Sequence, residues 1–236
     1  MDRISLITVF IFTLCMNTYT VSAENSERID SIKGDTAEIR CATVPWSMAV
    51  DNLHDCDLLF QSSRSANAIT DVTRGVAGMN IDHVGVFARL GGKPSVIEAL
   101  PGRGVCITPI DSFMVRGASG STCRPVAVGR VTSNLDFDVS LYRVSRFIGS
   151  RYDSLYLPDN KEIYCSELVQ LSFVDKDKNL IFDTVPMTFR DETGTIPDYW
   201  KRFYARHGMP VPEGKPGTNP GEMSRRKNVR IVMIMR

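Results

Sequence analysis

The chain has 236 residues, of which 43% are hydrophobic, and its 28 Lys and Arg residues nearly balance its 27 Asp and Glu residues. The length suits one compact domain with long loops better than two full domains. Because neither sign of charge dominates, we expect no nucleic-acid partner and no attraction to an acidic membrane surface.

The first 23 residues have the order of a secretory signal peptide. Arg3 precedes the apolar run 4–15, and the small-residue triplet Val21-Ser22-Ala23 precedes Glu24. The run is too short for a transmembrane helix, which needs roughly 20 apolar residues, and no later stretch is long enough. We therefore expect cleavage after Ala23, an exported protein that is periplasmic or extracellular, and no integral membrane segment in the mature chain.

The cysteine count indicates at least one free or intermolecularly paired thiol. An odd number of cysteines remains after the signal peptide, which in an oxidising compartment leaves at least one without a partner in the chain. If that thiol is Cys165, the other four allow up to two disulfides, in one of three connectivities; for Cys106 a buried thiol is an equal alternative. The five cysteines are Cys41, Cys56, Cys106, Cys123 and Cys165.

The region before the first predicted strand shows no periodic pattern. Residues 24–55 are polar and irregular, so we interpret them as an N-terminal extension to a domain that spans residues 56–236. Residues 57–61 predict a short buried strand. Residues 65–74 begin with a serine that can cap a helix and place apolar residues at helical spacing, so a helix is expected there.

Alternating side chains then predict a β-hairpin. Residues 82–89 and 94–100 each alternate in polarity and flank the pair Gly91-Gly92, which is a hairpin turn signal. A further strand is expected at residues 105–108, followed by a short helix at residues 109–114.

The C-terminal half mixes strands and helices. We expect strands at residues 125–131 and 229–235 and helices at residues 135–148, 164–174 and 197–207. Because strands and helices are interspersed without regular alternation, the pattern favours an α+β fold with a mainly antiparallel sheet.

Cys165 is well placed to act as a nucleophile. It lies at the start of the helix predicted at residues 164–174, on the face that Leu168 and Val169 turn toward the sheet. Unpaired backbone N–H groups and the helix dipole stabilise a thiolate at such a position. A thiolate nucleophile of this kind also needs a nearby base.

His83 is the best candidate for that base among three histidines. His207 lies near the end of a basic helix, where a cation is favoured by the helix dipole, and His54 lies in the extension. His83 lies in a strand beside Gly85, whose missing side chain leaves room for a neighbour.

Strand register identifies a third polar group. With Gly91-Gly92 as a two-residue turn, Gly85 faces Glu98 across the hairpin, and His83 lies on the same face as Gly85. Glu98 is therefore a diagonal neighbour of His83, where a carboxylate would fix the tautomer of the ring and support its protonated form. A register slip of one residue would turn Glu98 to the other face.

These residues fall in five segments that resemble, in the same order, a known family. The segments are Asp57 to Gln61, Asp82 to Val86, Val96 to Ala99, Gly149 to Asp153 and Tyr164 to Val169. From about residue 55 to the C-terminus the chain resembles the permuted papain-like cysteine hydrolases of the YiiX and YaeF type, relatives of the NlpC cell-wall peptidases. The resemblance implies a papain-like fold with Cys165 as nucleophile at a helix N-terminus, His83 as base and Glu98 as the third residue. The family usually has glycine where this chain has Cys56.

Four further residues are weaker candidates for substrate binding or for an oxyanion hole. Tyr164 precedes the nucleophile, and Tyr152 and Asp153 lie in the loop before it, although tyrosines packed against a helix start are at least as often structural. Gln61 is a candidate oxyanion donor beside the backbone N–H of Cys165. A surface position at the strand end is an equal alternative for Gln61.

Together these features indicate an exported cysteine hydrolase. It is expected to cleave an amide bond in a small amide, peptide or lipid amide through a thioester on Cys165, without a cofactor. An acyltransferase with the same Cys-His layout, as in lecithin:retinol acyltransferase-like proteins, would differ only in the nucleophile that resolves the thioester. The sequence leaves the oligomeric state open.

Two other classes of function are disfavoured. A metal site from Cys165, His83 and Glu98 is conceivable by ligand type, but the sequence has no Cys-x-x-Cys or His-x-x-x-His spacing, so no metal is expected. The presence of all three members of the triad counts against a non-catalytic binding module.

Overall fold

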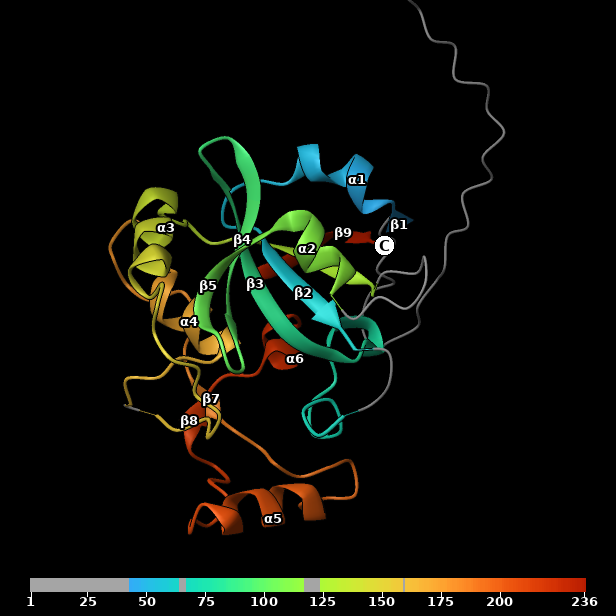
Figure 1. The fold of residues 1–236 in the computed structure, drawn as a ribbon, viewed down its shortest axis with the longest axis vertical. Helices are drawn as coiled ribbons and strands as arrows, with labels where there is room; N and C mark the ends of the chain where they lie inside the picture. The colour runs from blue at the N-terminus through green and yellow to red at the C-terminus, as the bar shows by residue number, and fades with distance from the viewer. Residues whose placement is uncertain (1–42, 64–66, 117–123, 159) are drawn as a thin grey trace, which may run out of the picture.

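The computed structural model describes residues 43–63, 67–116, 124–158 and 160–236. Seven strands form one sheet in the order β1-β9-β6-β2-β3-β4-β5, in which β1 and β9 run parallel and the other neighbours run antiparallel (Figure 1). A separate ribbon pairs β7 with β8. The strands are β1 Thr43–Val44, β2 Leu58–Ser62, β3 Ile81–Leu90, β4 Lys93–Leu100, β5 Gly104–Pro109, β6 Val126–Val131, β7 Val185–Pro186, β8 Pro216–Gly217 and β9 Val229–Met235.

Helices cover both faces of the large sheet. The helical elements are α1 Trp46–Ala49, η1 Val50–Asn52, η2 Val76–Gly78, α2 Ile110–Val115, α3 Phe137–Arg146, α4 Cys165–Ser172, α5 Asp198–Arg206 and α6 Pro220–Met223. This arrangement confirms the predicted α+β fold with a mainly antiparallel sheet. The predicted helices at residues 109–114, 135–148, 164–174 and 197–207 correspond to α2, α3, α4 and α5.

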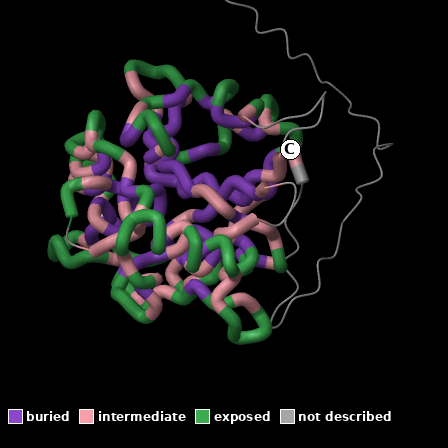
Figure 2. Tube along the Cα trace, turned by 60° about the horizontal axis from the view of Figure 1, so that its bottom comes forward, coloured by how far each residue is buried: buried purple, intermediate pink, exposed green. Residues whose placement is uncertain are grey.

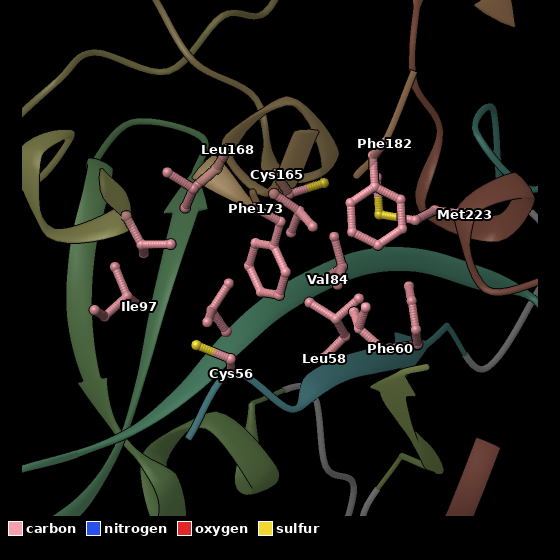
Figure 3. Close-up of a cluster of buried hydrophobic side chains, with 14 of the residues drawn as sticks. Cys56, Leu58, Phe60, Val84, Ile97, Cys165, Leu168, Phe173, Phe182 and Met223 are labelled. Carbon is pink, nitrogen blue, oxygen red and sulfur yellow. The ribbon is translucent and has the colours of Figure 1, made fainter. Parts of the chain in front are cut away.

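Strand alternation divides the core into two layers. On one face, Leu168 and Phe173 pack with Val84 of β3, and Figure 3 shows α4 lying over the strands at this point. On the other face, Phe113 of α2 packs with Val96 of β4. Figure 2 shows buried residues concentrated along the central strands and exposed residues in the surrounding loops.

Helix α5 packs outside these two layers. Trp200 and Tyr204 are buried with Phe189 in a third cluster. Helix α5, which carries Trp200 and Tyr204, lies apart from the large sheet in Figure 1. The indole nitrogen of Trp200 donates to the carbonyl of Ala68 at 3.0 Å. This cluster therefore joins α5 to the segment that follows β2.

The helix predicted at residues 65–74 is wrong. Residues 64–66 lie outside the described part of the chain, residues 68–72 form a turn, and residues 67, 73 and 74 have no regular secondary structure. The side-chain oxygen of Asn67 accepts hydrogen bonds from the backbone N–H groups of Ile69 at 3.0 Å and Thr70 at 3.1 Å. These bonds are those of a helix N-cap, and the backbone N–H groups of Asp71 and Thr73 donate to the carbonyls of Asn67 and Ile69, but the helical pattern does not continue beyond this turn. The apolar residues that suggested a helix pack on the α5 cluster.

The described cysteines are free thiols. Cys56, Cys106 and Cys165 form no disulfide, so the pattern of two disulfides is not present, and Cys41 and Cys123 lie outside the described residues. Cys56 adopts a φ of 68°, in the left-handed region that favours glycine. Cys56 therefore stands where the family usually has glycine, and its backbone conformation is one that suits glycine.

The predicted signal peptide, residues 1–23, also lies outside the described residues, as does the extension up to residue 42. The rest of the extension supplies β1, which pairs with β9, and α1, which packs on the α2 face. No helix in the described part of the chain is long and apolar enough to cross a membrane.

Candidate active site

Cys165 is the first residue of α4 and is 5% exposed. The backbone N–H of Tyr164, just before it, donates to the Glu167 carboxylate at 3.3 Å, which secures the start of the helix. Backbone N–H groups in a first helical turn have no acceptor within the helix. The thiol therefore lies where a helix presents hydrogen-bond donors and the positive end of its dipole.

The hairpin that carries His83 and Glu98 has the predicted register. Gly91 and Gly92 have φ values of 58° and 78°, as a two-residue hairpin turn requires, and Val86 pairs with Ile97. Beyond that pair, β3 continues its pairing with β2, and β4 continues its pairing with β5. The two strands thus no longer pair with each other where His83 and Glu98 lie, and α4 contacts both of them.

Gly85 lies beside Glu98 and close against Val96. A Cβ atom at Gly85 would lie 3.4 Å from the Cβ of Glu98 and 2.4 Å from a methyl group of Val96. Nε2 of His83 lies 2.6 Å from Oε2 of Glu98. The contact expected from strand register is therefore confirmed.

His83 connects the carboxylate to the thiol. Burial lowers the pKa of the His83 ring, but hydrogen bonds and charge interactions with Cys165 and Glu98 outweigh burial and raise this pKa to about 9. Because Nε2 faces Glu98, the other ring nitrogen is the one available to Cys165. The structure thus brings together the three residues that the sequence selected.

Glu98 is fully buried and has more partners than the sequence suggested. Nη1 of Arg116 donates to its Oε2 at 2.6 Å, and Nη2 donates to Oε1. Burial raises the pKa of Glu98, but hydrogen bonds from Arg116, His83 and Thr108 lower it to about 2. Arg116 was missed from sequence; the available signal was that a carboxylate in a buried strand needs a cationic partner.

A cavity of about 250 Å³ opens beside Cys165. Its walls are mainly apolar and aromatic, and the polar groups of Asp82, Thr218 and Arg225 lie among them. An amide bond of a substrate held in this cavity would lie next to the Cys165 thiol. The main apolar and aromatic lining residues are Ile69, Val72, Tyr152, Tyr156, Met187, Phe189 and Trp200.

Two tyrosines of the loop before α4 line this cavity. Burial raises the pKa of Tyr152 above its usual range and raises the pKa of Tyr156 to about 12, so both phenols keep their protons. The Tyr152 hydroxyl forms a hydrogen bond with that of Tyr156. Tyr156 has a φ of 51°, an uncommon conformation for a non-glycine residue.

Asp153 shapes this loop from within and is not among the cavity-lining residues. Its buried carboxylate accepts hydrogen bonds from the backbone N–H groups of Leu155 and Leu157, both at 2.8 Å, and from the Asn160 amide at 3.0 Å. These bonds hold the turn that carries Tyr156, which favours a structural role for Asp153 over direct substrate binding.

The two remaining candidates are also held by protein groups. The Gln61 amide, which is buried, donates to the carbonyl of Phe113 at 3.0 Å and so ties β2 to α2. The Tyr164 hydroxyl accepts a hydrogen bond from the Thr218 backbone at 3.0 Å, and its ring lies at the edge of the cavity. Gln61 is therefore not a surface residue, and its amide N–H group is already bonded to the Phe113 carbonyl.

Comparison with known proteins identifies the family. A family model described as the permuted papain-like amidase enzyme, YaeF/YiiX, C92 family, matches residues 52–233. The chain belongs to this family. The C92 match covers β2 to β9 almost completely and so includes Cys165, His83 and Glu98. The family is one of papain-like amidases, which confirms the enzyme class expected from the sequence.

A solved structure shares the C92 fold. It is described as the crystal structure of the metalloprotein YiiX from Escherichia coli O157:H7, and it is 21% identical to this chain with a TM-score of 0.57. The match covers 76% of this chain and 96% of the other. A search of curated proteins finds no match.

Within residues 43–63, 67–116, 124–158 and 160–236, no group of three or more His, Cys, Asp or Glu side chains is placed to hold a metal ion. Glu98 already accepts hydrogen bonds from Arg116 and His83.

Proposed function

We propose that the protein is an exported cysteine amidase in which Cys165 is the nucleophile, His83 the acid and base, and Glu98 the residue that orients His83. The observation that carries this proposal is the position of the His83 ring, whose Nε2 lies 2.6 Å from Oε2 of Glu98 and which also interacts with Cys165 at the start of α4. An imidazolium beside a thiol favours the thiolate, which is the reactive form.

The chemistry follows from these positions. The Cys165 thiolate attacks the carbonyl carbon of an amide in the cavity, and the negative charge moves to the carbonyl oxygen. Backbone N–H groups in the first turn of α4 are positioned to stabilise that charge. His83 gives its proton to the leaving amine, which leaves a thioester on Cys165. His83 then removes a proton from water, which attacks the thioester and releases the acid.

The cavity supports a peptide or acyl-amide substrate. Apolar and aromatic side chains line most of it, and the phenols of Tyr152 and Tyr156 remain protonated beside Cys165. A substrate with an apolar group near the scissile amide would bury that group against Met187 and Trp200. Hydrogen bonding from Tyr156 would hold a polar atom of the substrate near the reacting carbon.

Selective alkylation tests the nucleophile without knowledge of the substrate. Limiting iodoacetamide near neutral pH should modify Cys165 faster than Cys106, although Cys106 is the more exposed of the two. Burial and nearby acidic groups raise the pKa of Cys56 to about 12, so this thiol should react slowest. Reaction in order of exposure, measured by peptide mapping, would contradict an activated Cys165.

A substrate panel tests the reaction class. Acyl-amides and peptides should be cleaved by the wild type and by Cys106→Ser, and Cys165→Ala should cleave none of them. Addition of an amine or alcohol acceptor distinguishes hydrolase from acyltransferase, because a transferase would form the acceptor conjugate in place of the free acid. Turnover by Cys165→Ala would exclude the proposed mechanism.

Export is proposed from the signal-peptide pattern of residues 1–23. Expression of the full chain with its own leader, followed by N-terminal sequencing of the periplasmic or secreted protein, should give Glu24 as the first residue. A soluble cytoplasmic protein that retains Met1 would contradict export.

A further inference from the structure

Arg116 makes the most extensive side-chain contact with Glu98. Two guanidinium nitrogens donate to the two carboxylate oxygens, and Oε2 also lies 2.6 Å from Nε2 of His83. The Glu98 side chain is 0% exposed, whereas that of Arg116 is 27% exposed. The arginine therefore joins a buried carboxylate to the surface and neutralises its charge.

The position of Arg116 is itself fixed by neighbouring contacts. Its guanidinium lies 5.5 Å from the centre of the Phe113 ring, and the Phe113 carbonyl accepts a hydrogen bond from the Gln61 amide. The Arg116 carbonyl accepts a hydrogen bond from Nε of Arg124 at 3.1 Å. Because bidentate Arg–carboxylate pairs fix geometry as well as charge, these contacts set the plane of the Glu98 carboxylate.

We propose that Arg116 is a positioning residue that keeps Glu98 ionised and aimed at His83, and so sustains the pairing of His83 with Cys165. This inference rests on the proposed function of the Cys165 and His83 pair. Arg116 is not among the residues that line the cavity, and its contact with the site runs through Glu98.

Glu98 interacts with groups from three neighbouring elements. These groups are His83 from β3, Thr108 from β5 and Arg116 after α2, and Cys106 of β5 interacts with Arg116. Without the guanidinium, the buried carboxylate would take up a proton at higher pH. A neutral Glu98 would support the His83 imidazolium less, so Cys165 would react more slowly at acidic pH.

A buried ion pair elsewhere in the same sheet provides a matched control. Arg130 donates from Nε and Nη2 to the two oxygens of Asp57, each at 2.7 Å. The Arg130 side chain is 26% exposed and that of Asp57 is 1% exposed, which closely matches the pair of Arg116 with Glu98. Loss of either arginine removes an equivalent bidentate pair, but only Arg116 adjoins His83 through its partner.

The experiment measures the rate of Cys165 alkylation by iodoacetamide between pH 4 and pH 9 in full-length protein. Arg116→Gln should move the acidic limb of this profile upward by about one pH unit, which makes alkylation roughly tenfold slower at a pH on the limb. Arg130→Gln should keep the wild-type limb. Arg116→Lys keeps a charge but loses one contact, so it should shift the limb in the same direction by less.

The outcomes separate this inference from the proposed function. A wild-type limb, or a downward shift, in Arg116→Gln would overturn the role of Arg116. If that variant does not fold, Arg116→Lys decides, because a limb at or below that of the wild type would overturn the role equally. His83→Ala should flatten the profile at Cys165; if it does not, the pairing of His83 with Cys165, and with it the proposed function, is wrong.

Discussion

Replacing Glu98 with glutamine should destabilise the fold in a way that depends on pH. Glu98 is buried, and hydrogen bonds from Arg116 and His83 hold its pKa at about 2, compared with an ordinary value of 4.5. A carboxylate whose pKa is lower in the folded state stabilises the fold at pH values above its unfolded pKa. That stabilisation is lost as the pH falls through the folded pKa.

The size of the effect follows from the difference between these two pKa values. Each unit of difference between the two pKa values corresponds to about 1.4 kcal/mol, so Glu98 contributes roughly 3 kcal/mol to the free energy of unfolding near neutral pH. Between pH 4.5 and pH 3 more than about 1 kcal/mol of this contribution should disappear. Glu98→Gln cannot ionise, so its stability should lack this component over the same range.

Urea unfolding of both proteins at pH 7, 4.5 and 3 measures the difference directly. The gap in the free energy of unfolding between wild type and Glu98→Gln should narrow as the pH falls. Glu162→Gln, which removes a carboxylate from an exposed pair with Arg151, is the control and should cost less than about 1 kcal/mol. A gap that stays constant from pH 7 to pH 3 would refute the reasoning, because the contribution would then not come from an ionised Glu98.

Three further predictions test the surroundings of the site. Gly85→Ala places a Cβ atom 2.4 Å from a Val96 methyl group, so thermal unfolding should show a loss of about 1–3 kcal/mol, and an unchanged Tm would contradict the packing. Tyr156→Phe should lower kcat/KM by about threefold to tenfold through loss of one hydrogen bond, while iodoacetamide labelling of Cys165 stays at the wild-type rate; an unchanged kcat/KM would exclude contact of the Tyr156 hydroxyl with the substrate. Because His83 has a pKa of about 9, kcat/KM should decline as the pH rises through that value and the proton needed by the leaving amine is lost; a constant kcat/KM up to pH 10 would show that His83 is not the acid.

The sequence was informative where the structure is decided locally. The hairpin register depends on a two-residue turn whose glycines both have positive φ, and this turn alone aligned Glu98 with His83. The same holds for α4, in which Leu168 and Val169 follow Cys165 at helical spacing and are buried against the sheet. Each of these features is set by residues within a few positions of one another.

The sequence was less informative where the local structure depends on a side-chain hydrogen bond or on packing against a distant segment. Asn67 caps a turn at residues 68–72 that does not extend into a helix, although the apolar spacing there indicated one. Arg116 reaches Glu98 only because α2 packs on β4 through Phe113, and no periodic pattern reveals that packing. A cationic partner for Glu98 was nevertheless implied by elementary electrostatics, since an ionised carboxylate in a buried strand needs a compensating charge.

The β3–β4 ladder ends at Val86 and Ile97, and His83 and Glu98 lie beyond its end. There β3 stays paired with β2, and β4 with β5, so His83 and Glu98 are each supported by a different neighbouring strand. The start of α4 contacts both strands, and the thiol reaches the imidazole there. The distance between His83 and Glu98 therefore depends on the pairing of β3 with β2 and on the pairing of β4 with β5. Arg116 adds a third contact, which holds the Glu98 carboxylate in place as well as balancing its charge.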